Sequence, residues 1–125
     1  MSEELHEELT VAELIAEQQM ETREIVQELL DDGSQVDAIY TIEHHFASER
    51  FDVLEKLAVD VFKAGYSVED AEEVELEDGS IAYCFSAVVE HELDIERLNK
   101  DCESLIVLAD KHKALYDGWG THFIE

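Results

Sequence analysis

The sequence predicts an α+β fold: a ferredoxin-like sandwich with a four-stranded antiparallel sheet, two helices on one face of it, and an extra N-terminal helix. Apolar residues recur at helical spacing in three stretches, and with a period of two or as short apolar runs in the segments between them. The order along the chain is α, then β-α-β-β-α-β. Two split β-α-β units in that order give the strand order 4-1-3-2.

The extra helix is predicted over residues 11–32. Thr10 and Glu13 have the spacing of a capping box, in which each side chain accepts a hydrogen bond from the other residue's backbone N–H. Gly33 supplies the left-handed residue that ends many helices. The core-facing stripe, interrupted around Gln18, is predicted to comprise Leu14, Ile15, Thr22, Ile25, Val26, Leu29 and Leu30.

The first strand and the second helix come next. The stretch YTIEHHF, residues 40–46, alternates between two sets of side chains with the period of a strand. Ser48 is expected to cap the following helix and Gly65 to end it. The core face of that helix is predicted to comprise Phe51, Leu54, Leu57, Ala58, Val61 and Phe62.

A hairpin is predicted after the second helix. Residues 66–76 form an acid-rich extended arm, and Asp78-Gly79 predicts a tight turn because both residues tolerate positive φ. The returning arm, residues 80–89, has apolar side chains at both odd and even positions. Both of its faces are therefore expected to be covered, which places it in the middle of the sheet. We therefore expect the N-terminal helix, or a second protomer, to cover the face that the other two helices leave open.

The last two elements are a helix and a strand. Asp94 is expected to cap the helix, and the strand runs through LYDGWGTHFI, residues 115–124. The glycines on either side of Trp119 predict a bend or bulge in that strand. The core residues of the helix are predicted to be Leu98, Cys102, Leu105, Ile106 and Ala109.

Acidity is the strongest feature of the composition. The 125 residues contain 33 Asp and Glu against 8 Lys and Arg, a formal net charge of -25. This charge repels nucleic acid and anionic membranes, and it favours a basic protein partner. Simple solubility is the alternative explanation. Residues 1–10 are polar and expected to be disordered, whereas residues 11–125 have the usual size of one domain.

The two cysteines indicate a reducing compartment. Cys84 and Cys102 lie in apolar contexts, as buried thiols do, although one disulfide between them stays open. The chain begins with an acidic stretch where a secretory signal would be basic and then apolar, and no apolar run approaches the ~20 residues of a membrane span. The predicted location is the cytoplasm.

The paired histidines do not predict a metal site. In a strand His44 and His45 point to opposite faces, so they cannot converge on one ion without a bulge. A site across strands, with His122 and with Glu43 nearby, stays as an alternative, but the short-spaced zinc motifs are absent. His44 shares the parity of Tyr40, Ile42 and Phe46 and is expected to be a hydrogen-bonded core residue.

No catalytic motif is present in the sequence. There is no G-x-S-x-G, no glycine-rich phosphate loop, and no cysteine in an electropositive context that would lower its pKa. The carboxylates are too numerous to single out a catalytic pair. The sequence therefore predicts neither an enzyme nor a bound cofactor.

The segment EDAEEVELED, residues 69–78, has seven acids in ten residues. On a strand Glu73, Glu75 and Glu77 would share one face as a ladder with steps of about 7 Å. Such a ladder could bind an arginine-rich peptide, and the backbone of an edge strand can also form hydrogen bonds with an added strand of a partner. The alternative is an edge whose solvated charges only prevent aggregation. The candidate partner-binding residues are Glu69, Asp70, Glu72, Glu73, Glu75, Glu77 and Asp78.

Four phrases together resemble one bacterial family. ETREIVQELLDDGS, DAIYTIEHHF, LEKLAVDVFKAGY and YDGWGTHF are similar to the regulator of ribonuclease E activity B family, over roughly residues 21–123. The resemblance implies a ferredoxin-like fold and a non-catalytic role. Members bind the endoribonuclease, in the best-known case through its scaffold-like C-terminal region, and inhibit or redirect RNA cleavage.

The sequence departs from that family in two places. Gln35-Val36 occupies the position where Asp-Pro is expected, and Gln-Val should favour a turn there less strongly than Asp-Pro would. Longer members continue past YDGWGT into an acidic tail, so weaker binding or a different partner is expected here if that tail takes part.

The leading hypothesis is an acidic regulator, a monomer or weak dimer, that binds the basic C-terminal region of a ribonuclease E-like enzyme. A nucleic-acid mimic that occupies the RNA channel is the first alternative. A metal-binding protein that uses His44, His45 and His122 is the second.

Overall fold

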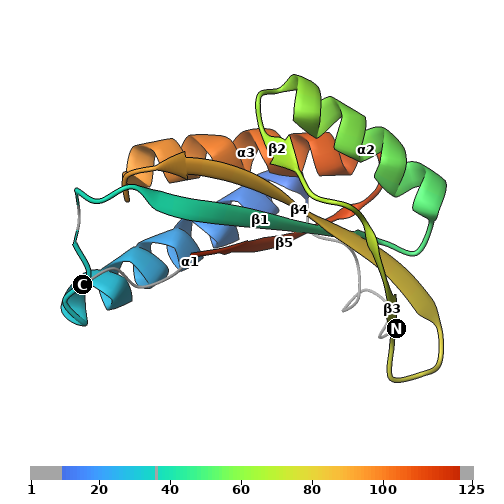
Figure 1. Ribbon diagram of the computed structural model, residues 1–125, viewed down its shortest axis with the longest axis horizontal. Coiled ribbons are helices and arrows are strands. Elements are labelled where there is room, and N and C mark those ends of the chain that lie inside the picture. Colours follow the sequence, from blue (N-terminus) through green and yellow to red (C-terminus); the bar gives the residue numbers. More distant parts are fainter. Residues whose placement is uncertain (1–9, 36, 122–125) are drawn as a thin grey trace.

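The computed structural model describes residues 10–35 and 37–121, and it has the predicted α+β fold (Figure 1). Of the segment expected to be disordered, only Thr10 lies within the described residues. The elements are α1 (Val11–Asp31), β1 (Tyr40–Ser48), α2 (Phe51–Lys63), β2 (Ser67–Val68), β3 (Glu72–Glu75), β4 (Ile81–His91), α3 (Ile95–Lys111) and β5 (Leu115–Gly120).

The sheet is antiparallel with the order β2-β4-β1-β5, and β3 also pairs with β4. β2 and β3 are thus two pieces of one edge strand, and the predicted order 4-1-3-2 is confirmed. The central position of β4 is confirmed as well, since β1 flanks it on one side and both edge pieces flank it on the other.

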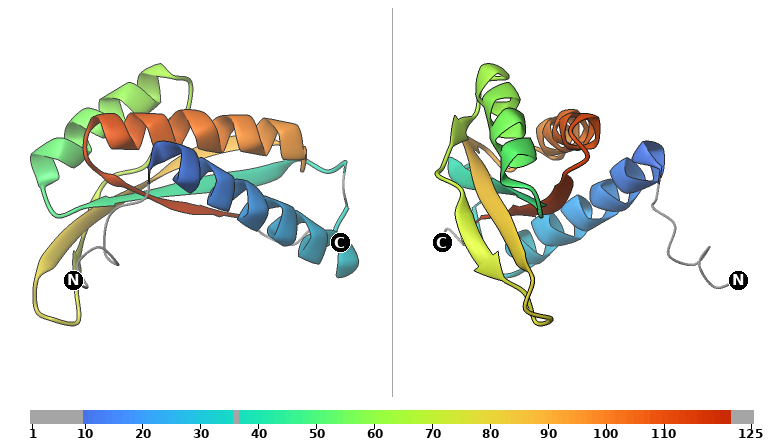
Figure 2. Two further views of the ribbon diagram at one scale, coloured as in Figure 1. Left: turned by 180° about the vertical axis from the view of Figure 1, so that it is seen from behind. Right: turned by 90° about the vertical axis from the view of Figure 1, so that its right-hand side faces the viewer.

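One face of the sheet is covered by helices (Figure 2). Side chains of β1 alternate as predicted, with Tyr40, Ile42, His44 and Phe46 buried beneath the helices. α2 contributes Leu54, Leu57 and Val61 to the core, and all five core residues predicted for α3 are buried. Burial of these apolar side chains is the main stabilising contribution to the fold.

Of the two covers predicted for the open face, the N-terminal helix is wrong, and a second protomer stays a prediction. α1 lies on the helix side of the sheet, beside α3, and leaves the other face open (Figure 2). The residues that it buries are Gln18, Thr22 and Val26, so the stripe runs through Gln18 rather than breaking there. This stripe meets Trp119, which lies opposite His44 on the helix side, and that contact fixes the location of the helix.

The helix caps are confirmed at two of three sites. Thr10 Oγ1 accepts from the Glu13 N–H at 3.1 Å and Glu13 Oε1 accepts from the Thr10 N–H at 2.9 Å, while Asp94 accepts from the first turn of α3. Ser48 is wrong as a cap: its hydroxyl accepts from the Arg50 N–H, and α2 begins at Phe51 without a side-chain cap.

The core face predicted for α2 is too wide. Phe51 is 44% exposed and Phe62 is 66% exposed, although Phe51 still contacts Tyr83 of β4 edge-to-face. Gly33 and Gly65 have positive φ at the ends of α1 and α2, as predicted. No helix in the described residues is long and apolar enough to cross a membrane.

The bend predicted in the last strand is confirmed. Gly118 has φ +90°, and the register of β5 against β1 shifts between His44 and Phe46. The bulge turns Trp119 into the core between α1 and α3, where its side chain is 6% exposed. The end of the predicted strand, residues 122–124, lies outside the described residues.

Candidate functional site

The seven predicted acids occupy the edge of the sheet and the hairpin that leads into β4. We name Glu69, Asp70, Glu72, Glu73, Glu75, Glu77 and Asp78 the acidic edge. Every residue from Glu69 to Ser80 is exposed, and the hairpin extends past the helices (Figure 1). β3 pairs only with β4 in the described chain, so the predicted edge position is confirmed.

An extra residue between β2 and β3 sets the direction of these side chains. Val68 lies opposite Ala87, but Glu72 lies opposite Cys84, so the edge strand has one residue more than β4 over this interval. Such a bulge reverses which residues face which side. Glu72 consequently faces the open side of the sheet, whereas Glu73 and Glu75 face the helix side.

The predicted ladder of three acids is wrong at Glu77. Glu73 and Glu75 share a face, but the turn begins at Leu76, whose carbonyl accepts from the Gly79 N–H at 2.9 Å. Glu77 and Asp78 are the central residues of this turn, and only Gly79 has positive φ. The hairpin is confirmed, but with a wider turn than the two-residue one predicted from Asp78-Gly79.

The acidic edge has no counterion among the residues that the structure describes. Within residues 10–35 and 37–121, no Lys, Arg or His forms an ion pair with any of its seven carboxylates. The Ser80 hydroxyl and N–H donate to Asp78, and these hydrogen bonds hold the pKa of that carboxyl below its usual value. The edge is therefore a group of solvated negative charges.

Basic side chains lie elsewhere in the molecule. No strand contains a Lys or Arg, and all eight of these residues lie in helices or the segments next to them. α2 and α3 carry five: Lys56, Lys63, Arg97, Lys100 and Lys111. The sheet and its acidic edge thus contain acids without Lys or Arg, whereas the helices carry charges of both signs.

Two residues near the acidic edge were not predicted to lie there: Asp117, which no sequence pattern singled out, and His45, which was considered only for a metal site. A hollow of about 250 Å³ on the open face is lined by Glu69, Asp70, Glu72, His45 and Asp117, among others. Asp117 comes from β5 and His45 from β1, so only the pairing of strands brings them there. Strict alternation in LYDGWG would place Asp117 on the face of Trp119, and only the bulge in β5 moves it to the other face.

The two histidines face opposite sides of the sheet, as predicted. His45 is half-buried on the open face and is hydrogen-bonded to the Ser86 hydroxyl at 3.0 Å. The described residues contain no group of three His, Cys, Asp or Glu that could hold a metal. His122, the third residue of the alternative metal site, lies outside them.

His44 is a buried, hydrogen-bonded core residue, and this prediction is confirmed. Its Nδ1 lies 2.8 Å from the Tyr116 hydroxyl, and that hydroxyl lies 3.3 Å from Cys102 Sγ. Burial lowers the pKa of His44 from 6.5 to about 4, against the opposing effect of Asp101. His44 is therefore neutral at physiological pH.

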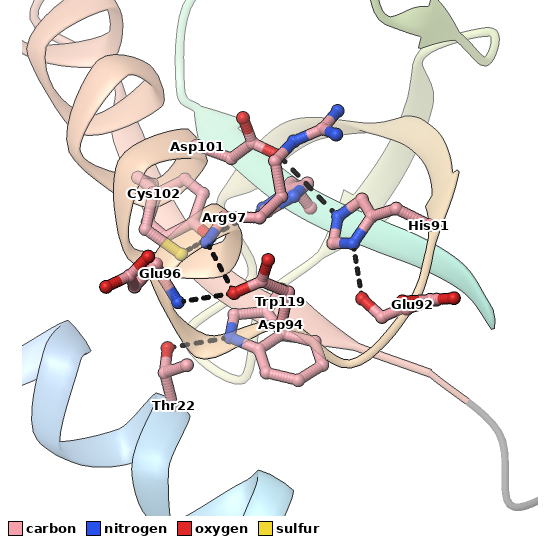
Figure 3. A network of polar contacts seen from close by, with 11 residues as sticks. Thr22, His91, Glu92, Asp94, Glu96, Arg97, Asp101, Cys102 and Trp119 are labelled. Atoms are coloured by element: carbon pink, nitrogen blue, oxygen red, sulfur yellow. Dashed lines mark hydrogen bonds and ion pairs between the residues drawn. The ribbon is translucent and has the colours of Figure 1, made fainter. Parts of the chain in front are cut away.

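Two polar contacts fix helices against this part of the sheet (Figure 3). The indole N–H of Trp119 donates to Thr22 Oγ1 at 2.9 Å, which ties α1 to β5. Asp101 of α3 accepts from Arg97 Nε at 3.0 Å and lies 3.6 Å from His91 Nε2 at the end of β4. The Trp119–Thr22 and His91–Asp101 contacts each join a helix to a strand, whereas the Arg97–Asp101 pair lies within α3.

The cysteines are both free thiols. Cys84 lies on the open face and Cys102 on α3, on opposite sides of the sheet, so the disulfide left open by the sequence is not formed. Burial raises the pKa of the Cys102 thiol, which makes it a poor nucleophile.

Comparison with known proteins identifies relatives over most of the chain. A family model described as "Regulator of ribonuclease activity B" matches residues 19–121. Proteins with that name are 58% identical in Shewanella amazonensis (116 residues, 93% of this chain and 82% of the relative) and 63% identical in Alteromonas mediterranea (101 residues, 81% and 76%). One in Psychromonas ingrahamii is 54% identical over 114 residues, 91% of this chain and 94% of the relative. This chain therefore belongs to the Regulator of ribonuclease activity B family.

Proposed function

We propose that this protein is a non-catalytic regulator that binds an endoribonuclease similar to ribonuclease E and lowers or redirects its cleavage of RNA. The family name supports a ribonuclease as the partner. The finer part of the proposal, a basic segment such as the C-terminal scaffold region of that enzyme, is supported by the acidic edge. Its seven carboxylates are exposed and form no ion pair with a basic side chain of the described residues.

The proposed location is the cytoplasm. Two free cysteines, one of them half-buried on the open face, suit a reducing compartment. A cytoplasmic regulator would also share the compartment of an RNA-degrading enzyme.

Neutralising the acidic edge is expected to slow association with the basic region of the ribonuclease about tenfold at low salt, because charge steering accelerates encounter by 10- to roughly 1000-fold. The variant is Glu73→Gln, Glu75→Gln and Glu77→Gln combined. Surface plasmon resonance against that region, at several salt concentrations, measures the association rate. The difference from the unmodified protein should shrink as salt rises.

The matched control changes the same net charge at another place. Glu21→Gln, Glu24→Gln and Glu28→Gln, combined, remove three exposed carboxylates from α1. Less than a twofold effect is expected. Equal slowing by both triple variants would show that net charge alone matters, and an unchanged rate for the edge variant at low salt would reject this surface.

Competition with RNA separates this proposal from a nucleic-acid mimic. A regulator that binds the scaffold region needs that region for binding and leaves RNA on the isolated catalytic domain. A mimic would displace RNA from the catalytic domain alone.

A further inference from the structure

A groove of about 630 Å³ lies between α2 and the edge of the sheet, beside the acidic edge. It is located where three residues, 69–71, separate β2 from β3. Its apolar lining comes from both elements and from the core below: Phe51, Leu54, Ala58, Val59, Val68, Ala71 and Phe85. The groove is thus an apolar recess at the point where the edge strand is interrupted.

Two large apolar side chains in the wall of this groove are exposed to solvent. Val59 is 51% exposed and Phe51 44% exposed, while the buried Phe85 belongs to the core. Phe51 is held in place by an edge-to-face contact with Tyr83, with ring centroids 5.3 Å apart. A preformed apolar recess of this kind gains free energy when an apolar side chain of a partner displaces its water.

Charges around the groove select the partner. Glu55, Glu69 and Asp70 line it, and Lys56 is the only basic residue among the lining side chains. Glu69 and Asp70 also line the hollow on the open face, so their carboxylates stand between two recesses. A second copy of this chain is a poor occupant, because it brings the same excess of acids and no Lys or Arg on any described strand.

We propose that the groove receives one apolar side chain from an extended segment of the ribonuclease, with Lys or Arg residues on both sides of that side chain paired to Glu55, Glu69 and Asp70. This inference rests on the proposed function and narrows it to a basic sequence with an apolar anchor. The acidic edge accelerates encounter, and the groove fixes the register of the bound segment.

Two labelled heptapeptides test the requirement for an apolar anchor. One has three arginines, a leucine and three arginines; the other has asparagine in place of leucine, which keeps the charge and nearly the size. Fluorescence anisotropy with the full chain at low salt measures both affinities. The leucine peptide is expected to bind about tenfold more tightly, since leucine loses most of its contact with water only in an apolar recess.

Two valine variants test the location. Val59→Gln places an amide in the groove and is expected to reduce the preference for leucine to less than threefold. Val107→Gln is the matched control: Val107 is 49% exposed on the outer face of α3, away from the groove, and this variant should keep the full preference. Both positions are exposed on helices, so circular dichroism should show unchanged folding.

The outcomes separate this inference from the proposed function. Equal affinity for the two peptides, or loss of the preference in Val107→Gln as well, would contradict the proposal that the groove binds an apolar side chain. The proposal that the protein binds basic segments would be unaffected. The triple variant of Glu73, Glu75 and Glu77 should weaken both peptides equally and preserve the preference. If neither peptide binds at low salt, the basic-segment proposal fails, and the groove fails with it.

Discussion

Replacing Trp119 with alanine is expected to lower the free energy of unfolding by about 4 kcal/mol, as removal of a large buried aromatic side chain does. Trp119 packs in the cluster that joins β1, α1 and α3, with Val26, Tyr40, Leu98 and Cys102 as neighbours. Its loss leaves a cavity there and removes the hydrogen bond to Thr22. Chemical denaturation followed by far-UV circular dichroism measures the change.

The same substitution should release α1 first. α1 packs against α3 and Trp119, and only three of its residues are buried. Hydrogen exchange is therefore expected to rise in α1 more than in α3. Thr22→Val serves as a comparison: it keeps the packing but leaves the indole N–H without an acceptor, at a cost of about 1–2 kcal/mol. A cost below 1 kcal/mol for Trp119→Ala would refute this account of how α1 is held.

Acidification from pH 6.5 to pH 4 is expected to remove roughly 3 kcal/mol of stability through His44 alone. The pKa of His44 is 6.5 in the unfolded chain and about 4 in the folded protein, because burial disfavours the charged ring and the nearby His91 and His45 oppose it further. Between these two values the unfolded state binds the proton and the folded state does not. Stability therefore falls as pH falls through this window, and it is fully retained above pH 6.5.

A variant pair isolates the contribution of His44 from that of the many carboxylates. His44→Gln keeps a hydrogen-bonding group near Tyr116 but does not titrate, so its stability should depend much less on pH between 4 and 6.5. His45→Gln changes the neighbouring residue on the open face and should keep most of the pH dependence, because burial, not His45, is the main cause of the lowered pKa of His44. An unchanged pH dependence in His44→Gln would show that another group causes the loss.

Local signals in the sequence predicted most of the elements of the fold. Capping by Thr10 and Asp94 depends on residues within one turn, and the stops at Gly33 and Gly65 depend on φ, so neither needs tertiary information. The side of the sheet taken by α1 could not be predicted this way. It depends on which long-range partner its stripe meets, and that partner, Trp119, lies 97 residues from Thr22.

The candidate site was partly predictable for the same reason. The acidic edge is contiguous in sequence, and its edge position followed from the strand order. The single extra residue between β2 and β3 left no clear signal, yet it decides that Glu72 faces the open side and Glu73 the helix side. The groove beside α2 depends on the exposure of Phe51, whose helical spacing had predicted burial.

The separation of charges between strands and helices also governs how a partner arrives. Lys and Arg are confined to helices and neighbouring segments, whereas the acidic edge gathers seven acids and no base within ten residues, so negative charge is denser there than on the helices and the molecule is charged unevenly. A polycation that comes within about a Debye length, ~8 Å at physiological salt, exerts a torque on it. The protein should therefore rotate its sheet edge toward the incoming chain before the two surfaces touch, and a larger fraction of collisions begins in the productive orientation.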